Sequence, residues 1–407
     1  MRFAAAALGA IIFAVAGAAE ARTWRIRPGP QAEQQLQTAL IEAEPGDTVQ
    51  LGRGRFELTA GLSLDVDRVT IRGEGEGRSI LSFDGQRRGA EGLLVTASDV
   101  VLRDFAVENT RGDGIKVRDC DGITFRGVRM EWTRGPNPEN GAYGLYPVNC
   151  ANVMIRDSIV RGASDAGIYV GQSRNIIVRD NLIEYNVAGI EIENSFGADV
   201  FGNTTTNNTG GILVFDLPGV PQSGGHSTRV FGNTIVNNNT PNFSPPGNIV
   251  GMVPAGTGVL IMASRNVHLF DNEIGDNATG NVIVFAYPNP FTDTNYNPLP
   301  RDVVIRNNSF GNGGYAPTGL LAPLGQAGIA IADVLWDGAT IYSVGGAART
   351  DIVRLVVRDN QSTRSGQGSF LSLGVPVAGS PFTEAAPDPT PPPLLDVEEP
   401  EEIRIRN

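Results

Sequence analysis

The chain has 407 residues, a formal net charge of −12, 51 glycines and only two cysteines. An acidic chain without a basic stripe is unsuited to nucleic-acid binding, and its repulsion disfavours polyanionic ligands unless cations intervene. Only two histidines occur, His226 and His268, and no His/Cys cluster has transition-metal spacing, which argues against a zinc or copper site.

The first 21 residues are typical of a secretory signal. Arg2 precedes an apolar stretch over residues 3–16, and small residues lead to Ala21. That stretch is too short to span a bilayer, and no other segment is apolar enough to do so. We expect cleavage after Ala21, a periplasmic or secreted protein, and no membrane insertion.

Residues 31–43 have the spacing of a short amphipathic helix. Their apolar side chains include Leu36, Ala39, Leu40 and Ala43, and Pro45 with Gly46 ends the pattern. A helix at this place would cover the first coil of a stack, where strand backbone is otherwise unpaired.

From residue 92 onward the chain repeats with a period close to 22 residues. Gly followed by an aliphatic residue recurs at positions 92, 114, 144, 167, 189, 211 and 258. Within one period, residues 168–189, three short segments alternate apolar and polar residues, and each is followed by Ser, Asn or Gly. This pattern predicts an all-β fold, a single-stranded right-handed parallel β-helix with three strands per coil. We expect it over residues 22–374, with regular coils over about 45–315.

Two columns of residues keep the repeat in register. Stacked amides can hydrogen-bond between coils at the bend after the second strand, where Asn recurs as Asn181, Asn203, Asn233, Asn272 and Asn308. A second column is small and includes Cys120 and Cys150 in successive coils. Neighbours ~4.8 Å apart could form a disulfide in an oxidising compartment, or both could be buried thiols in place of Ser.

Four insertions flank the first strand of the coil. Residues 133–143 and 239–257 precede it, and residues 217–228 and 287–301 follow it, so they would wall in the outer face of its sheet. Alternation places these side chains on or beside that face: Lys116, Arg118, Tyr143, Tyr146, Tyr169, Gln172, Glu191, Glu193, Asn194 and Asp216, with Trp132 from a loop. Aromatic rings beside amides and carboxylates suit a sugar chain, which predicts a polysaccharide groove. The alternative is a solvated strand face whose aromatics pack the loops.

Glu191 and Glu193 are the candidate catalytic residues. They point the same way, ~7 Å apart along the strand, and could act as acid and base or bind Ca²⁺ with Asn194 and Asp216. An ordinary acidic strand face is the alternative. Lys116 and Arg118 could orient a uronate or pair with carboxylates of neighbouring coils.

The end of the chain differs from the coils. Regularity fades over residues 316–374, and residues 375–407 are rich in Pro and acidic residues, which predicts an extended linker or docking segment. A second function is therefore open: a non-catalytic scaffold that docks another exported protein through its β face and this tail.

The coils resemble the pectate-lyase-like superfamily, whose repeats are grouped as carbohydrate-binding or sugar-hydrolysis modules. Segments 141–150, 162–173, 186–195 and 207–219 resemble, more closely, a family of exported bacterial β-helix repeat proteins without an established activity. The first resemblance implies a polysaccharide ligand. The second implies an exported protein partner.

The alginate epimerases of that superfamily have a short active-site motif that this chain matches in part. Tyr143-Gly144-Leu145 and Pro147 agree with it, whereas Tyr146 and Val148 replace its Asp and His. Because both proton-transfer groups are lost, an enzyme of this sequence is expected to be a hydrolase or lyase rather than an epimerase.

Overall fold

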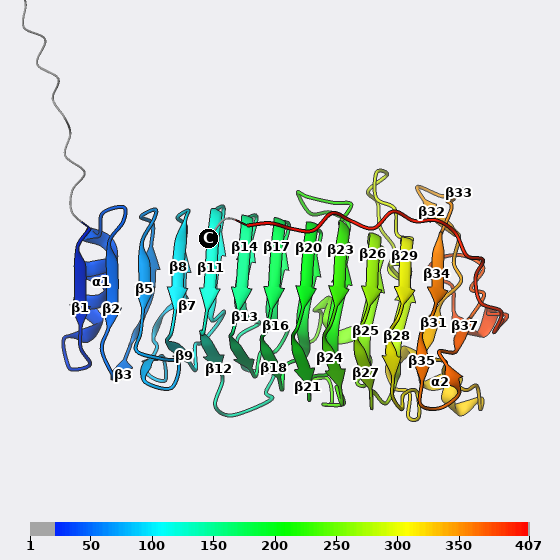
Figure 1. Ribbon diagram of the computed structural model, residues 1–407, viewed down its shortest axis with the longest axis horizontal. Coiled ribbons are helices and arrows are strands. Elements are labelled where there is room, and N and C mark those ends of the chain that lie inside the picture. Colours follow the sequence, from blue (N-terminus) through cyan, green and yellow to red (C-terminus); the bar gives the residue numbers. More distant parts are fainter. Residues whose placement is uncertain (1–20, 406–407) are drawn as a thin grey trace, which may run out of the picture.

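Three long parallel β-sheets enclose one interior, and the coils lie side by side along the long axis of the molecule (Figure 1). The computed structural model describes residues 21–405. The expected signal, residues 1–21, lies outside the described residues apart from Ala21. The all-β parallel β-helix with three strands per coil, expected from the 22-residue repeat, is confirmed.

Each sheet is named here after the position of its strands in the coil. The first-strand sheet contains β4 (Ala60–Leu64), β7 (Arg88–Val95), β10 (Ile115–Arg118), β13 (Tyr143–Val148), β16 (Ala166–Gly171), β19 (Ala188–Glu193), β22 (Gly210–Phe215), β25 (Thr257–Met262), β28 (Gly280–Phe285), β31 (Val334–Trp336) and β37 (Phe370–Ser372). The second-strand sheet contains β1 (Thr23–Ile26), β2 (Thr48–Leu51), β5 (Thr70–Arg72), β8 (Val100–Arg103), β11 (Asp121–Arg126), β14 (Ala151–Arg156), β17 (Arg174–Arg179), β20 (Phe196–Phe201), β23 (His226–Phe231), β26 (Arg265–Phe270), β29 (Arg301–Arg306) and β34 (Leu355–Arg358).

The third-strand sheet contains β3 (Gly54–Glu57), β6 (Ser79–Ser82), β9 (Ala106–Glu108), β12 (Arg129–Glu131), β15 (Ile159–Arg161), β18 (Leu182–Glu184), β21 (Thr204–Thr206), β24 (Thr234–Val236), β27 (Glu273–Gly275), β30 (Ser309–Phe310), β35 (Gln361–Ser362) and β36 (Gly366–Gln367). The remaining elements are the hairpin of β32 (Ile341–Val344) and β33 (Ala347–Thr350), the helices α1 (Ala32–Glu42) and α2 (Ala322–Gln326), and the 3₁₀ turns η1 (Ile249–Met252), η2 (Gly319–Leu321) and η3 (Phe382–Glu384).

Alternation along each strand becomes alternation between the interior and the surface. In β11, Ile123 and Phe125 are buried, whereas Thr124 between them is only half-buried. Ile123 pairs with Val153, and Val153 pairs with Ile176, so β-branched side chains form continuous columns through the interior. Each such side chain contributes about 1.5–3 kcal/mol when it is fully buried, and neighbouring coils supply the burial.

The asparagine ladder expected after the second strand is confirmed. The Asn203 amide nitrogen donates to Asn233 Oδ1 at 3.0 Å and to the Val178 carbonyl at 2.9 Å, while Asn203 Oδ1 accepts from the Asn181 amide at 2.9 Å. The chain turns just before this column, since Asp180 has a φ of 56°. Left-handed backbone favours Gly, Asn and Asp, which explains why these residues precede the ladder.

A second ladder follows the third strand and was not predicted. Asn186 donates to Asn208 at 3.0 Å, Asn208 to Asn238 at 3.0 Å, and Asn238 to Asn277 at 3.3 Å. All four side chains are completely buried. Each stands five positions after a residue of the first ladder, so the signal was present in the sequence.

Cys120 and Cys150 are free, buried thiols, so the disulfide considered from the sequence is not formed in this structure. Cys150 Sγ lies 3.5 Å from the carbonyl oxygen two residues earlier, at Val148. Ser173 in the next coil makes the equivalent contact with its hydroxyl, at 2.8 Å from the Gly171 carbonyl. The cysteines thus take the place of Ser in this column.

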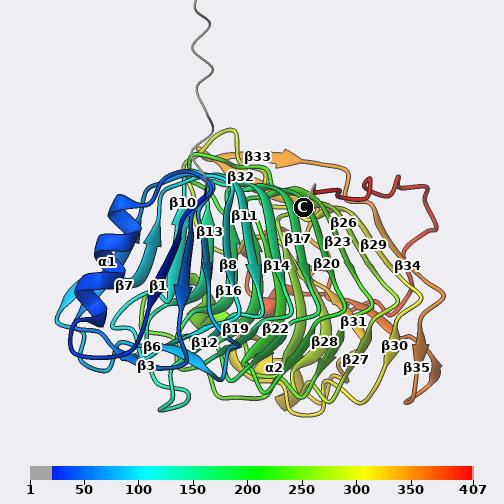
Figure 2. The ribbon, with the colours of Figure 1, turned by 60° about the vertical axis from the view of Figure 1, so that its left-hand side comes forward.

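The amphipathic helix expected over residues 31–43 is confirmed as α1. It buries Leu36, Ala39 and Leu40 against the first coil at one end of the stack (Figure 2). Among the described residues, no helix is both long enough and apolar enough to cross a membrane.

The C-terminal tail returns over the molecule and lies along the outer face of the second-strand sheet (Figure 1). Glu399 pairs with Arg306 at 2.8 Å and with Arg229 at 3.4 Å. Further along, the backbone N–H of Ile403 donates to Asp199 at 3.0 Å. The tail therefore contacts strands that precede it by about a hundred residues or more.

Candidate functional site

The predicted site residues share the outer face of the first-strand sheet, but most of that face is covered. Lys116 pairs with Tyr146 in register, and Tyr169 pairs with Glu191. Arg118 is exposed and Lys116, Tyr143 and Tyr146 are half-buried, whereas Tyr169 is 5% exposed and Glu191 only 1%.

The expectation of one open groove along the whole face is therefore wrong. The face is open near β10 and β13 and is covered from β16 onward. The inserted loops between β22 and β23, between β24 and β25, and between β28 and β29 pack on it and bury their own side chains Val250 and Tyr296 against it. These loops make a second apolar cluster, separate from the interior, because the outward side chains there are themselves apolar, as at Leu213 and Phe215.

Glu191 and Glu193 lie inside this cluster and contact one another. Glu193 accepts a hydrogen bond from the Tyr169 hydroxyl at 2.8 Å. Burial, reinforced by the nearby carboxylates, raises the pKa of Glu191 well above its usual value, and burial also raises the pKa of Glu193. Protonation of Glu191 avoids a pair of buried charges, while its Oε2 has no hydrogen-bond partner among the described residues.

Asp165 is a third carboxyl of the site and was missed in the sequence. It is 4% exposed and accepts a hydrogen bond from Asn248, in the loop between β24 and β25, at 3.0 Å. Burial, followed by the charge of Glu193, raises the pKa of Asp165 to about 7. It stands directly before β16 and 83 positions from Asn248, so sequence spacing alone did not connect the two residues.

Three tyrosines separate the carboxyls from the open part of the face. The ring centroids of Tyr143 lie 4.5 Å from those of both Tyr146 and Tyr169, and those of Tyr146 and Tyr169 lie 5.0 Å apart. Burial raises the pKa of Tyr146 to about 12 and raises those of Tyr143 and Tyr169 further. All three hydroxyls are therefore neutral hydrogen-bonding groups at neutral pH rather than bases.

Lys116 stands over the Tyr146 ring, with its Nζ 4.7 Å from the ring centroid. Two carboxylates compensate its charge: Asp113 at 3.6 Å and Glu91 at 3.9 Å. Arg118 pairs with Asp119 at 3.0 Å. The open part of the face therefore has no surplus of positive charge to attract an anion.

Asn194 and Asp216 hold a loop instead of facing a substrate. The Asn194 amide donates to Asp216 at 2.8 Å, and Asp216 also accepts the backbone N–H groups of Gly224 and Gly225 at 3.1 and 2.7 Å. Gln172 lies beside the same loop, 3.5 Å from the backbone nitrogen of Gln222. The substrate-binding roles expected for Asn194 and Asp216 stay predictions, and in this structure both side chains are buried and bonded within the protein.

Trp132 likewise does not face the site. It is 1% exposed, packs in the interior cluster, and donates its indole N–H to the Thr110 carbonyl at 2.8 Å. The part of the chain that the structure describes holds no group of three or more His, Cys, Asp or Glu side chains placed to bind a metal ion. Calcium binding by Glu191, Glu193, Asn194 and Asp216 stays a prediction.

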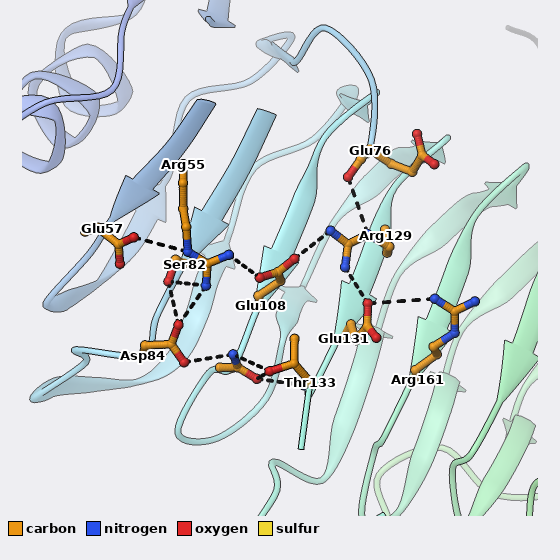
Figure 3. A network of polar contacts seen from close by, with 11 residues as sticks. Arg55, Glu57, Glu76, Ser82, Asp84, Glu108, Arg129, Glu131, Thr133 and Arg161 are labelled. Atoms are coloured by element: carbon orange, nitrogen blue, oxygen red, sulfur yellow. Dashed lines mark hydrogen bonds and ion pairs between the residues drawn. The ribbon is translucent and has the colours of Figure 1, made fainter. Parts of the chain in front are cut away.

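A second charged cluster lies on the third-strand sheet (Figure 3). Glu108 is 5% exposed and lies between Arg55 and Arg129, pairing with Arg129 at 2.6 Å. Glu131 continues the series to Arg161 at 3.8 Å. Since these charges alternate and compensate one another from coil to coil, the cluster stabilises the stack and leaves no free charged group for catalysis.

Residues 71–220 match the family model described as a right handed beta helix region. The chain carries the right-handed β-helix fold. A mannuronan C-5 epimerase A-module (AlgE4) of Azotobacter vinelandii superposes with a TM-score of 0.52 at 15% identity, covering 85% of this chain and 93% of that one. DFA-IIIase of Arthrobacter chlorophenolicus A6, solved without its lid and in complex with GF2, superposes with a TM-score of 0.52 at 13% identity. The match covers 83% of this chain and 99% of that one. At these identities the likeness concerns the fold, and no curated protein matches the sequence.

The buried carboxyls predict an unusual dependence of stability on pH. Asp165 has a pKa of 3.8 in its ordinary state and about 7 in the fold, so between these values the folded protein holds a proton that the unfolded chain releases. The free energy of unfolding should therefore decrease as the pH rises toward 7 and level off above it. Urea unfolding measured across this pH range should show that the free energy of unfolding decreases less in Asp165→Asn than in the wild type, by up to about 4 kcal/mol.

Burial also raises the pKa of Asp337 to about 7. This residue is unchanged in Asp165→Asn, so part of the decrease in the free energy of unfolding should remain in the variant. Equal slopes in the wild type and Asp165→Asn would show that Asp165 is ionised in the fold.

Proposed function

We propose that this β-helix binds an uncharged polysaccharide on the open part of the first-strand face and hydrolyses it with a carboxyl group of the adjoining cluster. The observation that carries the proposal is the cluster of Asp165, Glu191 and Glu193, three carboxyls with raised pKa values that lie behind the half-buried rings of Tyr143 and Tyr146. A buried carboxyl that keeps its proton at neutral pH is the group that a general acid requires.

The tyrosines support a sugar ligand. Tyr146 is half-buried and presents part of its ring beside Lys116, and a sugar ring stacks its C–H face on such a surface. Proteins that share the fold support a polysaccharide ligand only in general, since one is named as an epimerase of mannuronan.

The surrounding charges favour a neutral glycan and hydrolysis over a uronate and a lyase reaction. Glu91 and Asp113 already compensate Lys116, and Asp119 compensates Arg118. A uronate carboxylate would therefore meet no uncompensated cation on this part of the face.

The test is a panel of neutral and anionic polysaccharides, with binding and new reducing ends both measured. We expect binding to a neutral member, and Tyr146→Ala should weaken it about tenfold because the stacking ring is lost. Tyr315→Ala is the matched control, since this tyrosine is 54% exposed and lies away from the face. Preference for an anionic polysaccharide, or no glycan binding at all, would contradict the proposal.

The alternative function, a scaffold that docks another exported protein through residues 376–407, gains no support from the geometry. The tail already lies on the second-strand sheet of its own chain, held by Glu399 and Ile403. Export itself stays a prediction from the first 21 residues.

A further inference from the structure

A cavity opens on the outer face of the first-strand sheet, beginning one coil beyond Glu193. Its inner chamber, of about 40 Å³, is lined among the described residues by apolar side chains alone, including Phe215, Leu260 and Met262. An outer chamber of about 370 Å³ adjoins it, and Met252, Phe285 and Leu320 line both. The two chambers together form one passage from the surface toward the sheet.

We propose that this cavity binds an aliphatic chain that carries an uncharged, hydroxyl-bearing head group. The inner chamber offers no hydrogen-bonding side chain, so a buried sugar or peptide group would lose its bonds to water without replacement. A hydrocarbon chain loses nothing there and gains burial. The volume and the apolar lining with few polar groups are those of small-molecule sites.

The mouth of the cavity determines the head group. Its polar side chains are Asn289, Ser380 and Asp337, and no lysine or arginine of residues 21–405 lines either chamber. Asp337 uses its oxygens within the protein, accepting the backbone N–H groups of Ala286 at 2.8 Å and Ala339 at 3.1 Å. With no cation to pair with, a carboxylate or phosphate head is disfavoured, whereas a hydroxyl can bond to Asn289 or Ser380.

Leu320 lines both chambers at the rim and is 47% exposed, so its side chain is accessible to a ligand that enters the cavity. The inner end lies next to the carboxyl cluster, since Phe215 pairs in register with Glu193. The chain site is nevertheless separate, and its test does not depend on the proposed glycan hydrolysis.

Methionine methyl groups provide the test. The whole chain has five methionines, and Met252 and Met262 line the cavity, whereas Met130 lies in the interior and Met154 in β14 of the second-strand sheet. The protein is labelled with ¹³C-methyl methionine. Addition of n-octanol, or of n-octyl glucoside below its micelle concentration, should shift the methyl signals of Met252 and Met262 and leave those of Met130 and Met154 unchanged. Sodium octanoate should bind at least tenfold more weakly. Tighter binding of octyl glucoside than of octanol would show that the aliphatic ligand is a glycolipid. Equal binding of the two would show that it is a free aliphatic alcohol.

Chain length and one rim variant complete the design. Affinity should rise about fourfold for each methylene between hexyl and octyl glucoside, because each added group is buried. Leu320→Glu should weaken octyl glucoside binding at least tenfold, while Ile352→Glu, at a position 78% exposed and outside the cavity, should not change it. Absence of shifts at Met252 and Met262, affinity independent of chain length, or unchanged binding by Leu320→Glu would each overturn the proposal.

Discussion

Replacing Glu193 with Gln should lower the rate of glycan hydrolysis by about 10²–10⁴-fold, because the amide cannot transfer a proton to the leaving sugar. The fold should be kept, since the Gln oxygen can still accept the Tyr169 hydroxyl that lies 2.8 Å from the Glu193 carboxyl. Glycan affinity should change little, because Tyr146 and Lys116 form the binding surface and remain in place. Reducing-end release and equilibrium binding, measured on the same preparation, separate the two effects.

The pH dependence gives a second readout of this variant. Burial raises the pKa values of Glu191 and Glu193, so the proton-donating form persists to a higher pH than in an exposed Glu, and the wild-type rate should fall as the pH rises through the shared titration. Glu191 is completely buried and acts through Glu193, so Glu191→Gln should move this fall to a different pH rather than abolish turnover. Glu273→Gln, on the exposed part of β27, is the matched control. Unchanged turnover in Glu193→Gln would remove the catalytic assignment.

Replacing Asn203 with Ala should lower the free energy of unfolding by about 3–5 kcal/mol, a large effect for one uncharged side chain. The side chain accepts from the backbone and side-chain nitrogens of Asn181 and donates to Val178 and Asn233. All of these partners are buried, so each would be left without its bond in the variant.

Urea denaturation followed by circular dichroism measures this loss as a lower midpoint. Asn295→Ala is the control, because Asn295 is exposed in a loop and should change stability by less than about 0.5 kcal/mol. A loss below about 1 kcal/mol for Asn203→Ala would show that water or a rearranged neighbour replaces the missing bonds.

Residue spacing alone was sufficient for the architecture. The 22-residue period, the Asn column and the helix near residues 32–42 all reappear, because each repeat buries its apolar face only against an equivalent repeat. The register of the repeat also predicted that Tyr146, Tyr169 and Glu191 share one outer face, because a side chain on a strand points either to the interior or to the surface.

The site itself was predicted only in part. Glu191 and Glu193 were expected on an accessible wall, yet they are buried by loops whose conformation no repeat determines. Asp165 was overlooked because its role depends on Asn248, 83 positions away, which reaches it only after the loop folds back. The conformations of long insertions depend on contacts that are distant in sequence, so periodicity carries no information about them.

The sequence by itself determined the coil, its register, the inward columns and the side chains that share each face, because these follow from local alternation repeated at a constant interval. Only the tertiary structure decided which of those faces remain open. The loops over β16 to β28 turn a strand surface into a second apolar cluster, and that change of surroundings lets Glu191 keep a proton that solvent would otherwise remove.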